Sequence, residues 1–260
     1  MNKKLATIIL AAGKGKRMKN PNKSKVMYEL CGKPLIEYVV DLALKINSEK
    51  IVLIVGHQKQ SVIDFISKRY KKDIDKIKFA HQDEQLGTGH AVMQTEPELK
   101  NFNGSVLILS GDVPMLRYET VQDFIYFHFK YKFNASLLSA IFDNPYGYGR
   151  IIRDEECNFI DIREDKDATE EEKKINEINS GIYIIDNKYL FKALKTLRTD
   201  NAQGEYYLTD VFNYFKKQKI KIGASAVRDE QEIAGINTID QLGEMEKLMK
   251  KSIKKNKISK

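Results

Sequence analysis

Short apolar runs alternate with longer amphipathic segments through the first half of this chain, and turn residues separate them. The apolar runs have the length and composition of buried strands. They are Leu5–Leu10, Ile51–Val55, Ile77–Ala80 and Val106–Leu109. The amphipathic segments predict helices from Pro34 to about Lys45, near Ser61–Tyr70 and near Gly89–Gln94. This alternation predicts an α/β fold, a Rossmann-like, mostly parallel sheet flanked by helices, with its binding crevice at the carboxyl ends of the strands.

The second half has a different pattern, in which polar turns separate strand-like segments. These segments are Ala135–Phe142, Gly149–Arg153, Asn158–Arg163 and Ile182–Ile185. We expect them to form a smaller mixed sheet over the crevice. The charged stretch Glu164–Lys174 predicts an exposed loop or a short helix. A last helix is expected from about Ile239, with Leu242, Met245 and Met249 on one face.

The net charge of +8 is concentrated at one end of the 260-residue chain. Residues 247–260 contain seven lysines and no acidic residue, so the remainder is nearly neutral. This distribution argues against a specific nucleic-acid-binding surface and is typical of a solvated tail. The two cysteines, Cys31 and Cys157, have no zinc or disulfide spacing. Since no membrane-length apolar run and no signal cleavage site is present, we expect a soluble cytoplasmic protein.

A glycine-rich loop, Leu10-Ala11-Ala12-Gly13-Lys14-Gly15-Lys16-Arg17-Met18, follows the first predicted strand. It matches neither a P-loop nor a dinucleotide-binding fingerprint. Its small residues allow backbone N–H groups to approach an anion closely, and Arg17 offers a planar guanidinium to phosphate oxygens. Spacing alone leaves open an ordinary tight turn with exposed lysines.

Four further segments indicate which family of proteins this loop belongs to. They are Gln85-Leu86-Gly87-Thr88-Gly89-His90-Ala91, Gly111-Asp112-Val113-Pro114, Gly147-Tyr148-Gly149-Arg150-Ile151 and Asn201-Ala202-Gln203-Gly204-Glu205-Tyr206-Tyr207-Leu208-Thr209-Asp210. Together with the loop they resemble the sugar nucleotidyltransferase superfamily. Within it, they resemble the uridyltransferase half of the bacterial bifunctional N-acetylglucosamine-1-phosphate uridyltransferase/glucosamine-1-phosphate acetyltransferases. The segments keep the order of that family from residue 5 to about residue 240.

The resemblance implies a Mg²⁺-dependent enzyme whose substrates are UTP and N-acetylglucosamine-1-phosphate. Its products would be pyrophosphate and UDP-N-acetylglucosamine, a precursor for cell-wall (peptidoglycan) synthesis. We expect residues 1–238 to form the nucleotidyltransferase domain and residues 239–260 to form a helix and a basic tail.

The resemblance also assigns roles to single residues. It places Arg17 and Lys25 at the nucleotide phosphates and makes Asp112 and Asn237 the Mg²⁺ ligands, with Arg17, Lys25 and Asp112 as the catalytic residues. From the residues alone, Lys25 could be a solvated surface charge. Asn237 could also cap the last helix.

Two groups of binding residues follow from the same resemblance. The nucleotide would be bound by Leu10, Ala11, Ala12, Gly13, Lys25, Gln82, Gly87, Thr88 and Gly111, and Gln82 and Gly87 would read uracil. The sugar would be bound by Gly149, Glu164, Asn179 and Asn237, and Thr88 would line the same site. Without the motif, Thr88 reads as a helix cap and Glu164 as solvated surface.

The sequence also departs from the family. The hexapeptide repeats that build its trimeric acetyltransferase β-helix are absent, so we expect a monomer or a dimer without acetyl transfer. Lys16, Ser24 and Ser110 replace a small residue, a proline and an aromatic residue of the usual pattern. A nucleotidyltransferase for another sugar-1-phosphate, such as glucose-1-phosphate, or for a cytidine nucleotide remains open, as does a catalytically silent nucleotide-sugar sensor or, through the tail, a polyanion-binding module.

Overall fold

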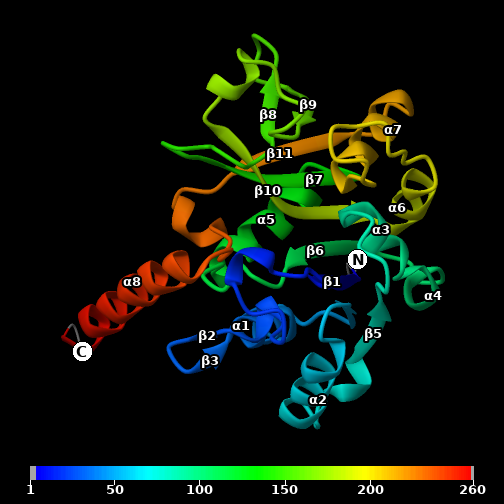
Figure 1. The fold of residues 1–260 in the computed structure, drawn as a ribbon. Coiled ribbons are helices and arrows are strands. Elements are labelled where there is room, and N and C mark those ends of the chain that lie inside the picture. Colours follow the sequence, from blue (N-terminus) through cyan, green and yellow to red (C-terminus); the bar gives the residue numbers. More distant parts are fainter. Residues whose placement is uncertain (1–3, 259–260) are drawn as a thin grey trace.

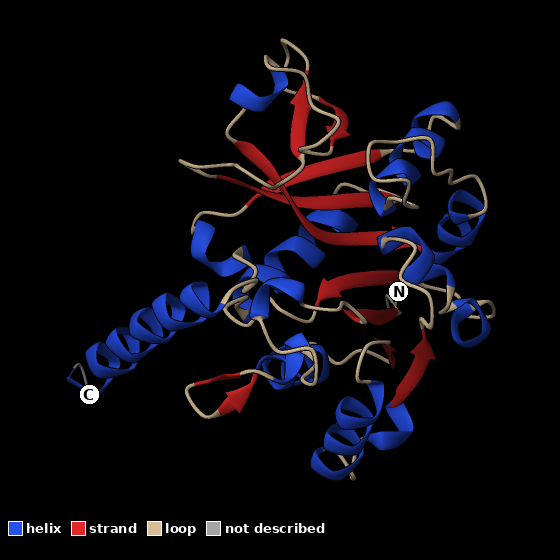
Figure 2. Ribbon diagram, viewed as in Figure 1, coloured by secondary structure: helices blue, strands red, loops and turns tan. Residues whose placement is uncertain are grey.

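A computed structural model describes residues 4–258 and shows one large sheet of nine strands. Seven strands lie side by side in the order β11-β7-β10-β6-β1-β4-β5, and the β8–β9 pair branches from β10 (Figures 1 and 2). The strands are β1 (Leu5–Ala11), β4 (Lys50–Val55), β5 (Ile77–His81), β6 (Ser105–Ser110), β7 (Ala135–Ile141), β8 (Arg150–Arg153), β9 (Phe159–Arg163), β10 (Glu177–Asp186) and β11 (Ile222–Ala226). A separate two-stranded ribbon joins β2 (Glu29–Leu30) to β3 (Lys33–Pro34).

Strand β10 is antiparallel to both of its neighbours in this row, β6 and β7, whereas every other neighbouring pair in the row is parallel. The first half of β10 therefore lies beside the carboxyl end of β6. The pairing of β10 with β7 shifts register between Asn179 and Tyr183, where Gly181 has a φ of 74°. Asn179 is thus brought to the same edge of the sheet as the loops that follow the parallel strands.

Helices cover both faces of the sheet. The core on one face includes residues of α1 (Leu35–Lys45), α2 (Lys59–Arg69) and α5 (Tyr118–Lys130). The core on the other face includes residues of α3 (Thr88–Met93), α4 (Glu96–Leu99), α6 (Asn187–Leu194) and α7 (Val211–Lys217). Short 3-10 turns connect these elements at Lys16–Met18, Lys25–Met27, Ile74–Lys76, Glu172–Lys174, Leu208–Asp210 and Glu230–Ile233.

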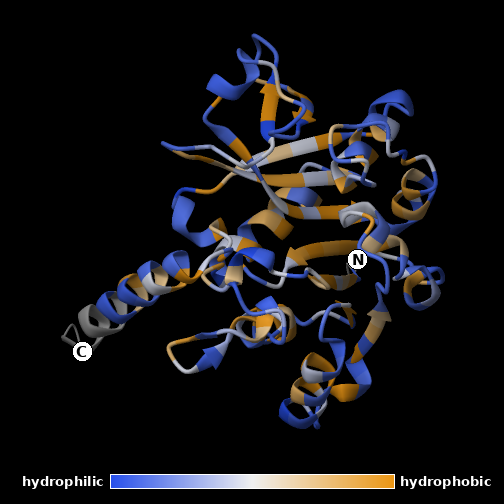
Figure 3. Ribbon diagram, in the orientation of Figure 1, coloured by the Kyte–Doolittle hydropathy of each residue, from blue (hydrophilic) through white to orange (hydrophobic). Residues whose placement is uncertain are grey.

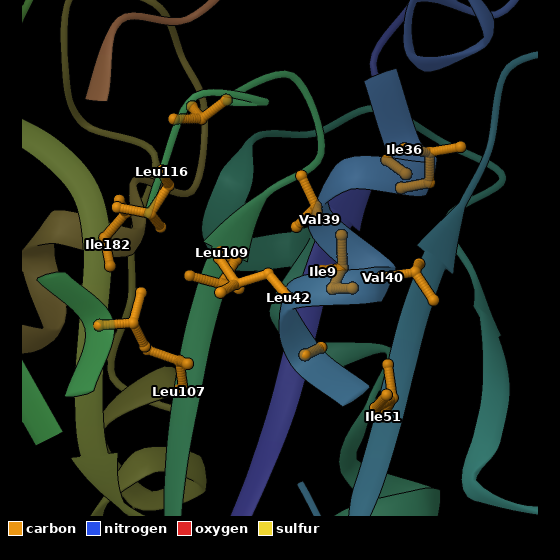
Figure 4. Close-up of a cluster of buried hydrophobic side chains, with 14 of the residues drawn as sticks. Ile9, Ile36, Val39, Val40, Leu42, Ile51, Leu107, Leu109, Leu116 and Ile182 are labelled. Atoms are coloured by element: carbon orange, nitrogen blue, oxygen red, sulfur yellow. The ribbon is translucent and has the colours of Figure 1, made fainter. Parts of the chain in front are cut away.

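The alternation of side chains along the central strand explains the two cores. In β1, Ile9 packs with the core that contains α1, whereas Ile8 packs with the core on the opposite face. Figure 4 shows Ile36, Val39 and Val40 of α1 facing the strands around Ile9. In Figure 3 the central strands are mostly apolar along their length, as expected for strands that are buried on both faces.

The last helix, α8 (Ile239–Ile258), projects away from the body of the protein (Figure 1). Its first turns pack through Leu242, Met245 and Met249 on a small cluster beside the β2–β3 ribbon. Its amino end is closed by Thr238 and Gln241, since each side chain accepts a hydrogen bond from backbone N–H groups across the turn. The alternative role of Asn237 as the cap of this helix is therefore wrong, because its side chain bonds to Lys25 and to the Gly235 carbonyl instead.

The predicted strands and the helices of the first half are confirmed to within a few residues, as is the start of α8. The mixed strands of the second half do not form a separate sheet, because β7 and β10 extend the main one. The sequence patterns did not predict α4, α5, α6, α7 or β11. Among residues 4–258, no helix combines the length and apolar character that a membrane span requires.

Candidate active site

A cleft of about 470 Å³ lies at the carboxyl ends of β1 and β6. The residues that line it come from the glycine-rich loop and from the segments that follow β5 and β6. They include Leu10, Ala11, Ala12, Gly13, Lys25, Gln82, Gly87, Thr88 and Asp112. Most of the residues predicted to bind the nucleotide are therefore brought together in one cavity. Gly111 is buried beside it and donates its N–H to the Leu10 carbonyl at 2.9 Å.

The glycine-rich loop passes close to Lys25. Gly15 has a φ of 57°, and a Cβ at this position would lie 2.8 Å from the Cβ of Lys25. A larger residue would therefore be strained and would displace Lys25. Arg17 is exposed and is not one of the residues that line the cleft. Its charge acts weakly on the pKa of the Tyr148 hydroxyl, so Arg17 lies within electrostatic reach of Tyr148.

Lys25 connects the two predicted metal ligands. Its ammonium group forms an ion pair with Asp112 Oδ2 and donates a hydrogen bond to Asn237 Oδ1 at 2.6 Å. The Lys25 and Asp112 side chains are largely buried, with 14% and 20% of their surface exposed. Interpretation of Lys25 as a solvated surface charge is therefore wrong. Residues 25, 112 and 237 meet at one point although they are far apart in the sequence.

The oxygen atoms around Lys25 are of the kind that Mg²⁺ prefers. A carboxylate oxygen of Asp112 and an amide oxygen of Asn237 already converge on one cation, the ammonium group of Lys25. No group of three or more His, Cys, Asp or Glu residues that could hold a metal is found within residues 4–258. Two oxygens fit Mg²⁺ where substrate phosphates and water supply the remaining ligands.

Gln82 and Gly87 form a fixed unit at one end of the cleft. Gln82 is 4% exposed, and its Nε2 donates to the Gly87 carbonyl at 3.0 Å and contacts His90 Nδ1 at 3.3 Å. Among the described residues, no hydrogen bond is made to Gln82 Oε1, so this oxygen can accept one. Thr88 Oγ1 accepts the N–H of Leu208 instead of capping its own helix, so the predicted cap is wrong.

A second, smaller cavity of about 210 Å³ adjoins the cleft, and Leu10, Thr88 and Ser110 line both. Gly149, Glu164 and Asn179, three of the residues predicted to bind the sugar, line this second cavity. They come from the amino end of β8, the end of β9 and the first half of β10. Asn237 lines neither cavity and lies behind Lys25.

Glu164 is not solvated surface, contrary to the prediction of an exposed loop at this point. Its Oε1 accepts a hydrogen bond from Thr209 Oγ1 at 2.8 Å. Burial raises the pKa of the Glu164 carboxyl, and the nearby charges of Asp210, Asp167 and Asp165 act in the same direction. The cavity therefore contains a carboxyl group that ionises less readily than a surface glutamate.

The sequence interpretation missed the role of Tyr148, although its motif was noted. Tyr148 lines the smaller cavity, and burial raises the pKa of its hydroxyl. The Gly235 backbone and the charge of Asp112 also act on that pKa. Tyr148 therefore lies near the metal-ligand candidate Asp112 and the segment that carries Asn237. Its position in the glycine-rich motif, between Gly147 and Gly149, was the available signal.

Comparison with known proteins agrees with this arrangement, since the nucleotidyl transferase family matches residues 6–230. The chain belongs to the nucleotidyl transferase family. Among solved structures, a UDP-glucose pyrophosphorylase complexed with UDP-glucose superposes with a TM-score of 0.77, covering 96% of this chain and 99% of that one. At 19% identity, the likeness establishes the shared fold.

Curated relatives are closer in sequence. The bifunctional protein GlmU of Thermoanaerobacter pseudethanolicus is 48% identical over 249 residues, which are 96% of this chain and 52% of the relative. The bifunctional protein GlmU of Geotalea daltonii is 43% identical over 252 residues, covering 97% and 54%. The chain thus spans about half the length of the curated relatives that it matches.

Proposed function

We propose that the protein transfers the uridylyl group of UTP to N-acetylglucosamine-1-phosphate, producing UDP-N-acetylglucosamine and pyrophosphate. The observation that carries this proposal is the pair of adjoining cavities, which share Leu10, Thr88 and Ser110 beside Asp112. One cavity has the loop and lysine suited to a nucleotide, and the other has the polar groups suited to a sugar. Membership of the nucleotidyl transferase family and similarity to GlmU proteins support the same reaction.

The reaction joins two anions at one phosphorus atom. An oxygen of the sugar phosphate attacks the α-phosphorus of UTP, the bond from that phosphorus to the bridging oxygen breaks, and pyrophosphate leaves. Catalysis of this kind depends on positioning and on neutralising charge. Lys25 and Arg17 supply fixed positive charge, and backbone N–H groups of the glycine-rich loop would bind the phosphates.

Asp112 and Asn237 are the proposed Mg²⁺ ligands. When bound there, Mg²⁺ would withdraw charge from the phosphate oxygens at the reacting phosphorus. Since Lys25 contacts both ligands, its ammonium group must move toward a phosphate when the metal binds. Gln82 and Gly87 are proposed to read uracil, while Gly149, Glu164 and Asn179 bind the sugar. Gly111 holds the Asp112 loop against Leu10.

A panel of substrates tests the proposal. Pyrophosphate release is measured with UTP, CTP, dTTP and ATP, each against N-acetylglucosamine-1-phosphate, glucose-1-phosphate and a sugar-1-phosphate of different ring stereochemistry. We expect the highest kcat/KM for UTP with N-acetylglucosamine-1-phosphate. A higher kcat/KM with glucose-1-phosphate would show that the protein is a nucleotidyltransferase for that sugar phosphate instead. Absence of pyrophosphate release with every pair of substrates would support a catalytically silent nucleotide-sugar sensor.

We further propose that residues 1–238 form the transferase domain and that residues 239–260 lie outside it. Among the residues whose side chains the structure describes, none of α8 lines either cavity, which supports this boundary. The cytoplasm is the proposed compartment, because UTP is a cytoplasmic nucleotide.

A further inference from the structure

Arg150 is a buried guanidinium group outside both cavities. It is the first residue of β8, is 2% exposed, and lines neither the cleft nor the smaller cavity. Its Nε is buried without a hydrogen-bond partner among the described residues. Burying such a charge is costly, and ion pairs offset the cost incompletely, so stability alone does not account for it. The groups that Arg150 holds indicate what it does.

Arg150 connects the two loops that carry sugar-cavity residues. Its Nη1 donates to the carbonyl oxygen of Tyr148 in the loop before β8. Its Nη2 pairs with Asp165 Oδ1 at 3.0 Å and lies 3.5 Å from the Lys173 carbonyl, both in the segment after β9. A planar guanidinium can hold several acceptors in fixed directions, whereas an ammonium group cannot. One buried side chain thus fixes the separation between these loops.

The contacts of Arg150 lie next to the residues proposed to bind the sugar. Tyr148 precedes Gly149, and Asp165 follows Glu164. A Cβ placed on Gly149 would be 3.5 Å from Glu164 Oε2, so the two loops face each other closely. The Gly149 carbonyl also accepts the N–H of Asn179 at 2.7 Å, which joins the third sugar-cavity residue to the same unit.

We propose that Arg150 is a positioning residue for the sugar-phosphate substrate, acting through Tyr148 and Asp165 on the placement of Gly149 and Glu164. This inference rests on the proposed function. It predicts that loss of Arg150 affects one substrate and not the other. The KM for the sugar phosphate should rise, and the KM for the nucleotide should stay unchanged. Arg150 itself contacts neither the glycine-rich loop nor Gln82 or Gly87, and its hydrogen bond to Tyr148 goes to the backbone carbonyl, not to the hydroxyl on which Asp112 and Arg17 act.

The test compares Arg150→Met with a matched variant on the same strand. Methionine fills similar space without a charge, and Asp165, with 20% of its side chain exposed, can then be hydrated. The control is Arg153→Met. Arg153 pairs with Glu177 at 2.6 Å and donates to the Cys157 carbonyl at 2.9 Å, and neither partner lines the cleft or the smaller cavity. Both variants are assayed by pyrophosphate release, with each substrate varied in turn.

We expect Arg150→Met to raise the KM for the sugar phosphate by about tenfold or more, because small displacements of binding groups are costly, and to change the KM for UTP by less than about twofold. Arg150→Lys, which keeps the pair with Asp165 and loses the fork, should lie between wild type and Arg150→Met. Arg153→Met should keep both KM values. Equal changes in both KM values for Arg150→Met, or the same change for Arg153→Met, would overturn the inference.

The assay distinguishes failure of the proposed function from failure of the role proposed for Arg150. If wild-type protein releases no pyrophosphate from UTP with any sugar phosphate, the proposed function fails, and with it the basis for this inference. If wild type turns over but Arg150→Met shows no selective rise in the sugar KM, only the role of Arg150 is wrong. Should Arg150→Met fail to fold, Asp165→Asn takes its place, since it weakens the same ion pair from a partly exposed position. A sugar KM unchanged in Asp165→Asn would then count against the inference.

Discussion

Asp112 carries the one negative charge among the proposed metal ligands. Asp112→Asn keeps the shape of the side chain and removes that charge, so Mg²⁺ is held less firmly at the reacting phosphate. We expect turnover to fall by at least about tenfold, equivalent to roughly 1.4 kcal/mol of activation free energy. The measurement is kcat at limiting and saturating Mg²⁺. Asp123→Asn, at an exposed position of α5, serves as the control, and a folded Asp112→Asn protein with unchanged kcat would refute the assignment.

Gln82 is expected to select the base through its free oxygen. Its Nε2 is already bonded to Gly87, so Oε1 is left to accept the N3–H of uracil, whereas N3 of cytosine is itself an acceptor. Gln82→Ala should therefore reduce the preference for UTP over CTP. An unpaired buried group costs about 1 to 3 kcal/mol, or roughly a five- to hundredfold change in the ratio of the two kcat/KM values. If kcat/KM falls equally for UTP and CTP, Gln82 does not read the base and acts instead by fixing the position of Gly87.

Glu164 makes stability depend on pH because its folded pKa is raised by burial. The folded protein binds this proton more tightly than the unfolded chain does, so the stabilising contribution is present at low pH and is lost as pH rises through the folded pKa. Glu164→Gln cannot ionise. Its Tm relative to wild type should therefore increase as pH rises above the ordinary glutamate pKa and level off above the raised pKa of Glu164, while its KM for the sugar phosphate rises.

Glu170→Gln, whose side chain is 86% exposed in the same segment, provides the control for this titration. It should follow the wild-type Tm at every pH. A constant Tm difference for Glu164→Gln across the range would mean that Glu164 ionises as an ordinary surface glutamate does.

At the scale of single elements, the start of α3 depends on close backbone packing. Gly87 has a φ of 111°, and a Cβ there would lie 2.6 Å from the Tyr206 carbonyl oxygen. Gly87→Ala should lower the free energy of unfolding by about 2 kcal/mol and raise the KM for UTP, because the clash moves the end of the cleft. Gly204→Ala, at a φ of 64° with no atom within 4 Å, isolates the cost of the backbone conformation. Equal losses of stability in the two variants would exclude the clash.

The burial of each helix and strand explains which of them could be predicted from the sequence. Strands such as β1 were predictable because they are buried on both faces and so form continuous apolar runs. Helix α5 was missed since aromatic residues lie on both of its sides: Phe124 is 1% exposed, whereas Tyr126 is 62% exposed. The first half of β10 was missed because the polar residues around its register shift interrupt the apolar pattern.

The candidate site was predictable only as a set of residues. The motifs named Lys25, Asp112 and Asn237, yet their contact depends on three segments that only the folded sheet and the start of α8 bring together. Arg150 belongs to one of the recognised motifs, but its role could not be predicted, because the motif does not show whether this arginine is buried between two loops or exposed on a strand.

At the scale of the whole molecule, the candidate active site lies in the body of the protein, whereas the excess of positive charge lies in the basic tail. We therefore expect the tail to affect binding to polyanions and not catalysis. Leu242, Met245 and Met249 of α8 pack on the body of the protein. Residues 252–260 carry four lysines and no acidic residue. Deleting them should leave Tm and kcat/KM unchanged and should lower the salt concentration at which the protein elutes from heparin, since fewer counterions are exchanged. A matched loss of kcat/KM in the shortened chain would instead show that the lysines help to capture the anionic substrates, and that loss would diminish as ionic strength is raised.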